Sequence, residues 1–196
     1  TGSQYVFSWQ NTISFLSLED NLFSYVLSLP IVFISHLVLL LGFREAVYTS
    51  GFSIFSVSID LTEKAFDKID YITDINTFDV LKVPFIPDFI WASPPCTYFS
   101  VASIGKHWNK NNTPKSDNAL KGVQYVKSTL EIINYFLKIN PNLVWYMENP
   151  RGKLRKLDIV KGLPRTTIWY CKYGDFRAKP TDIWSNNIYN PMFKPN

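Results

Sequence analysis

Two side chains that can take part in catalysis each follow an apolar run. Cys96 ends a Ser-Pro-Pro-Cys segment that comes directly after the apolar residues 89–92, and Glu148 follows the apolar residues 143–147. Apolar runs of this length are typical of buried strands. Because ligands of open α/β sheets bind beyond the carboxyl ends of the strands, both side chains are expected at one site. A thiol and a carboxylate there would act as a nucleophile and its acid or hydrogen-bonding partner.

Both residues also have a plain structural interpretation. A lone cysteine is often a small buried apolar residue, and its thiol is mostly protonated at neutral pH because its ordinary pKa is about 8.5. The two prolines before Cys96 favour a functional role, since they end the strand and present the next side chain in a defined direction. A buried, unpaired Glu148 would be costly, so we expect it at a solvent-facing strand end or in a functional site. Asn149 and Pro150 are expected to stop its strand at once.

The composition is that of one globular domain. Of the 196 residues, 46% are apolar and 18% are charged, which excludes a disordered chain and allows a real core. The aromatic content of 16% predicts a well-filled core, and stacking on nucleobases is an open alternative. The two cysteines, Cys96 and Cys171, make no disulfide framework, and together with two histidines they show no metal-ligand spacing. We therefore expect an intracellular protein without a metal.

Many of the basic residues fall into two clusters. The net charge is +4, from 20 Lys and Arg against 16 Asp and Glu. A basic rim around a cleft would suit a polyanion such as nucleic acid, but a solvated face explains either cluster equally well. The first cluster follows Cys96 and comprises Lys106, His107, Lys110 and Lys115, and the second comprises Lys153, Arg155, Lys156 and Lys161.

Residues 21–43 carry no charge and are long enough to span a bilayer, which needs about 20 apolar residues. Polar residues and Pro30 interrupt the stretch, and a proline breaks or kinks a helix. We therefore favour a buried strand at 29–34 followed by a buried helix at 36–48, with a membrane span as the alternative. No secretory signal precedes the stretch, and residues 5–20 show no clear period.

From residue 51 onward, strands and helices are expected to alternate, which predicts a parallel-dominated α/β sheet. Ser116 or Asp117 would cap a long helix that ends before Pro141, and its apolar positions recur every three or four residues from Leu120 to Leu137 as one buried stripe. Strands are predicted at 52–59, ending at Asp60, and at 69–72, 85–92, 143–147, 166–173 and 181–184, with a polar loop at 97–115 and a short helix at 151–160.

The segment Ser-Pro-Pro-Cys at 93–96, with Glu-Asn-Pro at 148–150 after a later strand, resembles the DNA cytosine-5 methyltransferases, above all their short phage and virus members. The resemblance implies a Rossmann-like methyltransferase sheet, mostly parallel with an antiparallel final hairpin and helices on both faces. It also implies S-adenosylmethionine as methyl donor and DNA as substrate. Residues 42–196 would form the catalytic domain and residues 1–41 an atypical N-terminal segment or insertion, in one domain overall.

In this family the Pro-Cys strand end carries the nucleophile and the Glu-Asn strand end binds the target base. Cys96 would attack C6 of a flipped-out cytosine, and Glu148 would hydrogen-bond its ring nitrogen and amino group. Arg177 is the candidate for the arginine that orients the base, with an exposed loop cation as the alternative. The resemblance assigns cofactor binding to Gly2, Asp60 (ribose hydroxyls), Asp74 and Ile75 (adenine) and Pro94, and substrate or DNA binding to Ser93, Pro95, Asn149, Lys106, His107 and Arg151.

The chain departs from the family at the Gly-rich turn between the first strand and the first helix, which has the pattern Phe-x-Gly-x-Gly. Residues 1–4, Thr-Gly-Ser-Gln, resemble the tail of that turn, and the first helix resumes at 42–46. Residues 29–34 are a candidate first strand, but the turn after it has no glycine for a close approach to a ligand. The recognition region of full-size relatives is expected to be minimal or supplied elsewhere.

Two functions from different classes follow. The first is transfer of a methyl group from S-adenosylmethionine to C5 of cytosine in DNA, through a covalent Cys96 adduct, by a monomeric enzyme. The second is a catalytically impaired relative that keeps the fold and acts as a DNA-binding or interaction module. An amino-methyltransferase is a third interpretation, but its Pro-Pro run is followed by an aromatic residue where this chain has Cys96.

Overall fold

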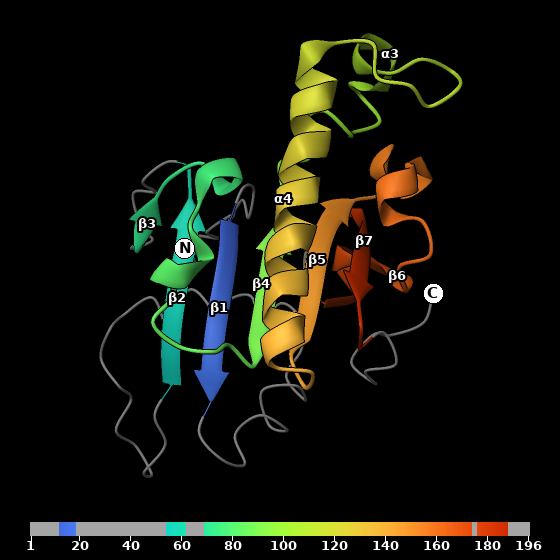
Figure 1. Ribbon diagram of the computed structural model, residues 1–196. Coiled ribbons are helices and arrows are strands. Elements are labelled where there is room, and N and C mark those ends of the chain that lie inside the picture. Colours follow the sequence, from blue (N-terminus) through green and yellow to red (C-terminus); the bar gives the residue numbers. More distant parts are fainter. Residues whose placement is uncertain (1–11, 19–53, 62–68, 174–175, 188–196) are drawn as a thin grey trace, which may run out of the picture.

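The computed structural model describes residues 12–18, 54–61, 69–173 and 176–187, which form a seven-stranded sheet with a long helix across it (Figure 1). The strand order is β3-β2-β1-β4-β5-β7-β6. The strands are β1 (Thr12–Leu18), β2 (Ile54–Asp60), β3 (Tyr71–Ile72), β4 (Phe89–Ser93), β5 (Val144–Pro150), β6 (Arg165–Trp169) and β7 (Pro180–Ser185). The helices are α3 (Ile104–His107) and α4 (Asp117–Ile139), with 3-10 helices η1 (Ile75–Thr77), η2 (Val80–Lys82), η3 (Leu154–Lys156), η4 (Asp158–Val160) and η5 (Tyr170–Tyr173).

Of the seven described strands, β1 and β7 run opposite to the other five. β2 pairs in parallel with β3, and β4 with β5, whereas β1 pairs antiparallel with β2 and β4, and β7 with β5 and β6. The α/β class and the antiparallel final hairpin are therefore confirmed. The expectation of a mostly parallel sheet is wrong for the strand pairings, four of which are antiparallel, because β1 lies reversed between two strands of the common direction.

The central position of β1 differs from the sequence analysis, which assigns no element to residues 5–20. Phe15 of β1 stands opposite Val57 of β2 and Ile90 of β4, and both partners lie far along the chain. The predicted strand at 29–34 and helix at 36–48 lie outside the described residues, as does the uncharged stretch 21–43. No helix in the described part of the chain is long and apolar enough to cross a membrane.

α4 begins and ends where the sequence predicts. Its N-cap residue is Ser116, whose hydroxyl accepts a hydrogen bond from the backbone N–H of Ala119 (3.2 Å). This bond satisfies one of the N–H groups that the first turn of a helix leaves without a partner. The helix ends at Ile139, just before Pro141, because a proline disfavours helical backbone in the residue that precedes it.

The buried face of α4 is not quite the predicted apolar stripe. Val126 and Ile133 are buried as expected, but Leu120 is 54% exposed. The helix runs lengthwise in front of β4 and β5 (Figure 1). It also contacts η1, where the hydroxyl of Ser128 donates to Asn76 (2.8 Å). Polar residues therefore share the buried face. The further helix that was predicted at 36–48 lies outside the described residues.

The two strands that lead to the candidate catalytic residues form the middle of the core. Every residue of β4 is buried, and Tyr146 and Met147 of β5 are almost completely buried. The rings of Phe89 and Tyr146 lie 5.7 Å apart between centroids. Since burial of one large apolar side chain stabilises the fold by about 1.5–3 kcal/mol, these strands give the site a rigid base.

β5 runs on through Asn149 to Pro150, past the point where the sequence analysis expects it to stop. Glu148 pairs with Ile183 of β7, and Asn149 pairs with Asp182. The antiparallel partner extends β5, and Pro150 is tolerated because it is the last residue of the strand. Glu148 is consequently held within the sheet.

Most other boundaries differ by a few residues from the predicted ones. β2 and β4 occupy the predicted strands at 52–59 and 85–92, and β3 keeps only two residues of the strand at 69–72. The predicted helix at 151–160 forms as two 3-10 turns, η3 and η4, and the predicted strand at 166–173 ends early and continues as η5.

Candidate active site

The candidate nucleophile follows β4, and the candidate acid lies near the carboxyl end of the neighbouring parallel strand β5. β4 and β5 pair with Ala92 opposite Met147, so that Glu148 comes one residue later and Cys96 follows two prolines after β4. Both side chains are buried, with 8% of Cys96 and 6% of Glu148 exposed, and the charge of Glu148 acts on the thiol. The sheet therefore places the two residues at the same edge, as expected for a site built from strand ends.

Two hydrogen bonds and a glycine tie the segment after β4 to the segment after β5. The side-chain amide of Asn149 donates to the carbonyl of Pro94 (2.9 Å), and the backbone N–H of Lys153 donates to the carbonyl of Phe99 (2.8 Å). A Cβ atom at Gly152 would lie 2.3 Å from the same Phe99 oxygen, so only glycine allows this approach. Asn149 is predicted to bind substrate, and its Oδ1 is buried without a hydrogen-bond partner in the described residues.

Burial shifts the pKa of both catalytic candidates upward. Burial raises the pKa of the Cys96 thiol above its ordinary value, the charge of Glu148 raises it further, and the charge of Lys179 opposes this. Burial also raises the pKa of Glu148 to about 7, against the opposing effects of Lys179 and of a hydrogen bond from Tyr170, while Asp182 adds to the rise. Near neutral pH, a large share of the molecules therefore carries a proton on Glu148.

Two residues that the sequence analysis does not single out surround the candidate acid. The hydroxyl of Tyr170 donates to Oε1 of Glu148 (3.3 Å), and the ammonium of Lys179 lies 5.3 Å from the centroid of the Tyr170 ring. No motif marks them, because the turn between β6 and β7 brings them together. Arg177, which is predicted to orient the base, is half-buried with its guanidinium 5.4 Å from the ring centroid of Phe176, and its role stays a prediction.

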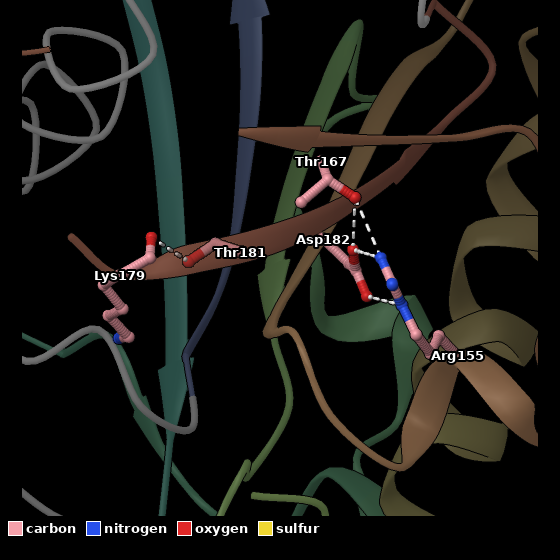
Figure 2. Close-up of polar contacts among 5 residues, drawn as sticks. All are labelled: Arg155, Thr167, Lys179, Thr181 and Asp182. Atoms are coloured by element: carbon pink, nitrogen blue, oxygen red, sulfur yellow. Dashed lines mark hydrogen bonds and ion pairs between the residues drawn. The ribbon is translucent and has the colours of Figure 1, made fainter. Parts of the chain in front are cut away.

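A second buried carboxylate, Asp182, lies on β7 beside β5. Figure 2 shows that Arg155 reaches both of its oxygens, with Nε donating to Oδ2 (2.8 Å) and a terminal nitrogen donating to Oδ1. The hydroxyl of Thr167 donates to Oδ1 (2.8 Å) and accepts from Arg155 (2.9 Å). At the start of the same strand, the hydroxyl of Thr181 donates to the carbonyl of Lys179 (3.4 Å; Figure 2). Arg155, counted in the second basic cluster, is thus half-buried in an internal ion pair.

Lys153 of the second basic cluster also points inward. It is 4% exposed, and its ammonium donates to Oδ1 of Asn112 (2.8 Å) while lying 5.5 Å from the ring centroid of Trp108. Burial, aided by the charge of Lys156, lowers the pKa of Lys153. Of this cluster, only Lys156 and Lys161 are exposed, so the cluster does not form a continuous basic rim.

The predicted polar loop at 97–115 packs through its aromatic residues. Trp108 is buried, stacks on Phe99 with ring centroids 5.9 Å apart, and donates its indole N–H to the carbonyl of Tyr98 (2.7 Å). His107 is also buried, and its Nδ1 lies 2.7 Å from the hydroxyl of Ser116, the N-cap of α4. Among the residues predicted to contact DNA, His107 is therefore internal, whereas Lys106, Arg151 and the neighbouring Lys110 and Lys115 are exposed.

Several predicted cofactor residues line one cavity at the carboxyl ends of β2 and β4. Asp60, Ile75 and Pro94, which the sequence analysis assigns to the cofactor, are among its lining residues. Asp74 positions Ile75 by capping η1, where its carboxylate accepts the backbone N–H of Asn76 (2.9 Å). Gly2 lies outside the described residues. The remaining lining residues are Ile59, Leu61, Thr73, Ser93, Pro95, Tyr125 and Thr129.

The sequence analysis misses the contribution of α4 to this cavity. Tyr125 and Thr129 lie one helical turn apart on the face that meets the cavity. Burial raises the pKa of the Tyr125 hydroxyl, and the charge of Asp74 raises it further. The lining is mostly apolar with one carboxylate and a few hydroxyls, which are groups that can bind the nucleoside part of a cofactor. Within the described residues, no group of three or more His, Cys, Asp or Glu could hold a metal ion.

No protein-family model and no solved structure matches this chain. A comparison with curated proteins finds a relative in Frog virus 3 (isolate Goorha), named as a probable DNA (cytosine-5)-methyltransferase, that is 31% identical over 137 residues. The match covers 66% of this chain and 59% of the viral protein. The chain is thus related to the DNA cytosine-5 methyltransferases of viruses, as its two strand-end motifs predicted.

Proposed function

We propose that the chain transfers a methyl group from S-adenosylmethionine to C5 of cytosine in DNA through a covalent adduct at Cys96. The observation that carries the proposal is a buried thiol and a buried, readily protonated carboxyl at the ends of β4 and β5, beside a cavity that contains Asp60. The printed name of the viral relative supports the same reaction.

Cys96 would act as the nucleophile. Its thiolate would form a bond to C6 of the cytosine ring, and the π electrons of the C5–C6 bond would make C5 electron-rich. S-adenosylmethionine, when bound, would supply the methyl group. Once C5 has lost its proton to water, the C–S bond would break, Cys96 would leave as a thiolate, and the ring double bond would re-form.

Glu148 would hold the cytosine ring and favour the attack. A protonated carboxyl has one O–H donor and one acceptor oxygen, which match the ring nitrogen and the amino group of cytosine. Because the pKa of Glu148 is about 7, the protonated form is well populated near neutral pH. A hydrogen bond from Glu148 to the ring nitrogen would stabilise the charge that develops when the thiolate adds to C6.

The two groups are electrostatically coupled in a useful direction. The negative charge of Glu148 raises the pKa of Cys96, so protonation of Glu148 removes this obstacle to thiolate formation. The charge of Lys179 lowers the pKa of both groups and remains when Glu148 is neutral. Protonation of Glu148 and the charge of Lys179 therefore both ease thiolate formation, against burial, which is the largest effect and raises the pKa of the thiol.

The cavity at the ends of β2 and β4 would hold the cofactor. The buried carboxylate of Asp60 can accept hydrogen bonds from ribose hydroxyls, and Ile75 would pack against the adenine. Pro94 would border the methyl-donor end, since it lines the cavity and is separated from Cys96 only by Pro95. Exposed Lys106 and Arg151 would contact DNA phosphates while the target base is flipped out of the duplex.

Trapping with 5-fluorocytosine DNA tests the proposal. Fluorine at C5 cannot leave as a proton does, so the Cys96 adduct should persist after methyl transfer and appear as a protein–DNA band on a denaturing gel. Cys96→Ala should abolish the band, because it removes the nucleophile. Cys171→Ala serves as the matched control and should leave the band intact, since Cys171 is an exposed thiol that forms no bond in the proposed reaction.

The wild-type result decides between functional classes. Absence of a band in the presence of cofactor, with DNA binding retained, would favour a non-catalytic DNA-binding module. Calorimetry with S-adenosylmethionine then shows whether the cofactor cavity is competent, with micromolar binding expected for an enzyme. Methylation at an amino nitrogen of the product nucleosides would instead point to an amino-methyltransferase.

A further inference from the structure

A tyrosine outside both motifs contacts the candidate acid. Tyr170 follows β6 directly as the first residue of η5 and is half-buried. Its hydroxyl donates a hydrogen bond to Oε1 of Glu148 (3.3 Å). This contact joins β5 to the β6–β7 turn, two parts of the fold that no sequence motif connects.

Two contacts with Lys179 hold Tyr170 in position. Its backbone N–H donates to the carbonyl of Lys179 (3.3 Å), and the Lys179 ammonium lies 5.3 Å from the ring centroid. The other charged or titratable groups near Glu148 are Asp182 on β7, which is paired with Arg155, and Cys96 after β4. Among the described residues, Tyr170 is thus the side chain that donates a hydrogen bond to the Glu148 carboxyl.

We propose that Tyr170 is a positioning residue that determines which oxygen of Glu148 carries the proton during base recognition. An oxygen that accepts the tyrosine hydroxyl remains an acceptor, so the proton resides on Oε2. Oε2–H then donates to the ring nitrogen of cytosine, and Oε1 accepts from its amino group. This role rests on the proposed function and deepens it.

The fixed order of donor and acceptor also explains a preference among bases. Cytosine offers an acceptor ring nitrogen beside a donor amino group, whereas uracil offers a donor ring nitrogen beside an acceptor oxygen. A carboxyl whose proton is confined to one oxygen matches the pattern of cytosine and opposes that of uracil. Without the Tyr170 hydroxyl, the proton can occupy either oxygen, and discrimination between the two bases weakens.

Tyr170→Phe removes the hydroxyl but keeps the ring beneath Lys179, and Tyr173→Phe in the same η5 is the matched control. The first measurement is a carbon-13 carboxyl NMR titration of Glu148 without substrate, assigned with Glu148→Gln. We expect a higher pKa for Glu148 in Tyr170→Phe, because a hydrogen bond to the charged form is lost. We expect no change in Tyr173→Phe.

The second measurement is adduct formation on 5-fluorocytosine and 5-fluorouracil DNA. Tyr170→Phe should lower the rate constant of adduct formation on 5-fluorocytosine DNA about tenfold, with a much smaller change in the DNA concentration that gives half the maximal rate, and should reduce the preference for cytosine over uracil. An unchanged Glu148 titration, or an unchanged rate of adduct formation and base preference, overturns the role of Tyr170. A wild-type protein that forms no adduct overturns the proposed function itself, which the titration does not depend on.

Discussion

Asp182 and Glu148 are buried carboxylates on the neighbouring strands β7 and β5, but their surroundings differ. Asp182 is bound by Arg155 at both oxygens and by Thr167, so its charge is compensated within the fold. Glu148 accepts one recorded hydrogen bond, from a neutral tyrosine hydroxyl, and burial raises its pKa to about 7. The comparison shows that the partner, more than the burial, decides whether a carboxylate supports the fold or stays available for proton chemistry.

Removal of Arg155 should disrupt the surroundings of Asp182 and cause the largest effect on stability. Arg155→Leu leaves Asp182 buried with Thr167 but without its counter-charge, so the free energy of unfolding should fall by about 3 kcal/mol. Urea denaturation measures this loss. The matched control is Lys156→Leu at the exposed neighbouring position, where a change within about 0.5 kcal/mol is expected. Equal losses in both variants would show that the ion pair is not what stabilises this region.

The pH dependence of stability tests the second region. The pKa of Glu148 is about 7 in the folded chain against an ordinary 4.5, so the unfolded chain releases this proton first. The stabilisation of the folded chain that results from this pKa difference is fully present below pH 4.5. It is lost as the pH rises to about 7, by a total on the order of 3 kcal/mol. Glu148→Gln does not titrate, so the stability of the wild type relative to this variant should decline across that pH range. A constant difference between the two proteins would contradict the raised pKa.

Lys179→Gln should have a smaller effect, on the ionisation of Glu148 and Cys96. The Lys179 charge lowers the pKa of Glu148 and of Cys96, so its removal should raise both. The effect should be modest because Lys179 is partly exposed and solvent screens its charge. NMR titration of Glu148 and the pH profile of adduct formation measure it, with exposed Lys172→Gln as the control. A lower Glu148 pKa in Lys179→Gln would show that Lys179 does not act through its positive charge.

Much of the fold around the motifs can be predicted from local sequence. The apolar runs before Cys96 and Glu148 indicate the central strands β4 and β5, and Ser116 with Pro141 marks the two ends of α4. These features depend on neighbours along the chain, so local patterns are informative. β1 could not be predicted in the same way, because Thr12–Leu18 forms a central strand only through pairing with β2 and β4.

The sequence also did not show which charged side chains point into the protein. Lys153 and Arg155 look like part of a basic surface cluster, but one is buried against Trp108 and the other pairs with Asp182. Charge patterns do not reveal which way a side chain points, since that depends on where η3 packs against distant segments. Likewise, the contact of Tyr170 with Glu148 needs the whole β6–β7 hairpin to pair with β5.

Local sequence features predict the candidate reactive groups of this protein and the strand ends that carry them, because strand-forming runs, prolines and polar ends involve neighbouring residues. These features predict Cys96 and Glu148 as the chemical pair and Asp60 as a cofactor contact. How these groups ionise depends on the tertiary structure, since burial, Tyr170, Lys179 and Asp182 act on Glu148 through space. Electrostatics in a buried site depends on distances between segments that are remote in the chain.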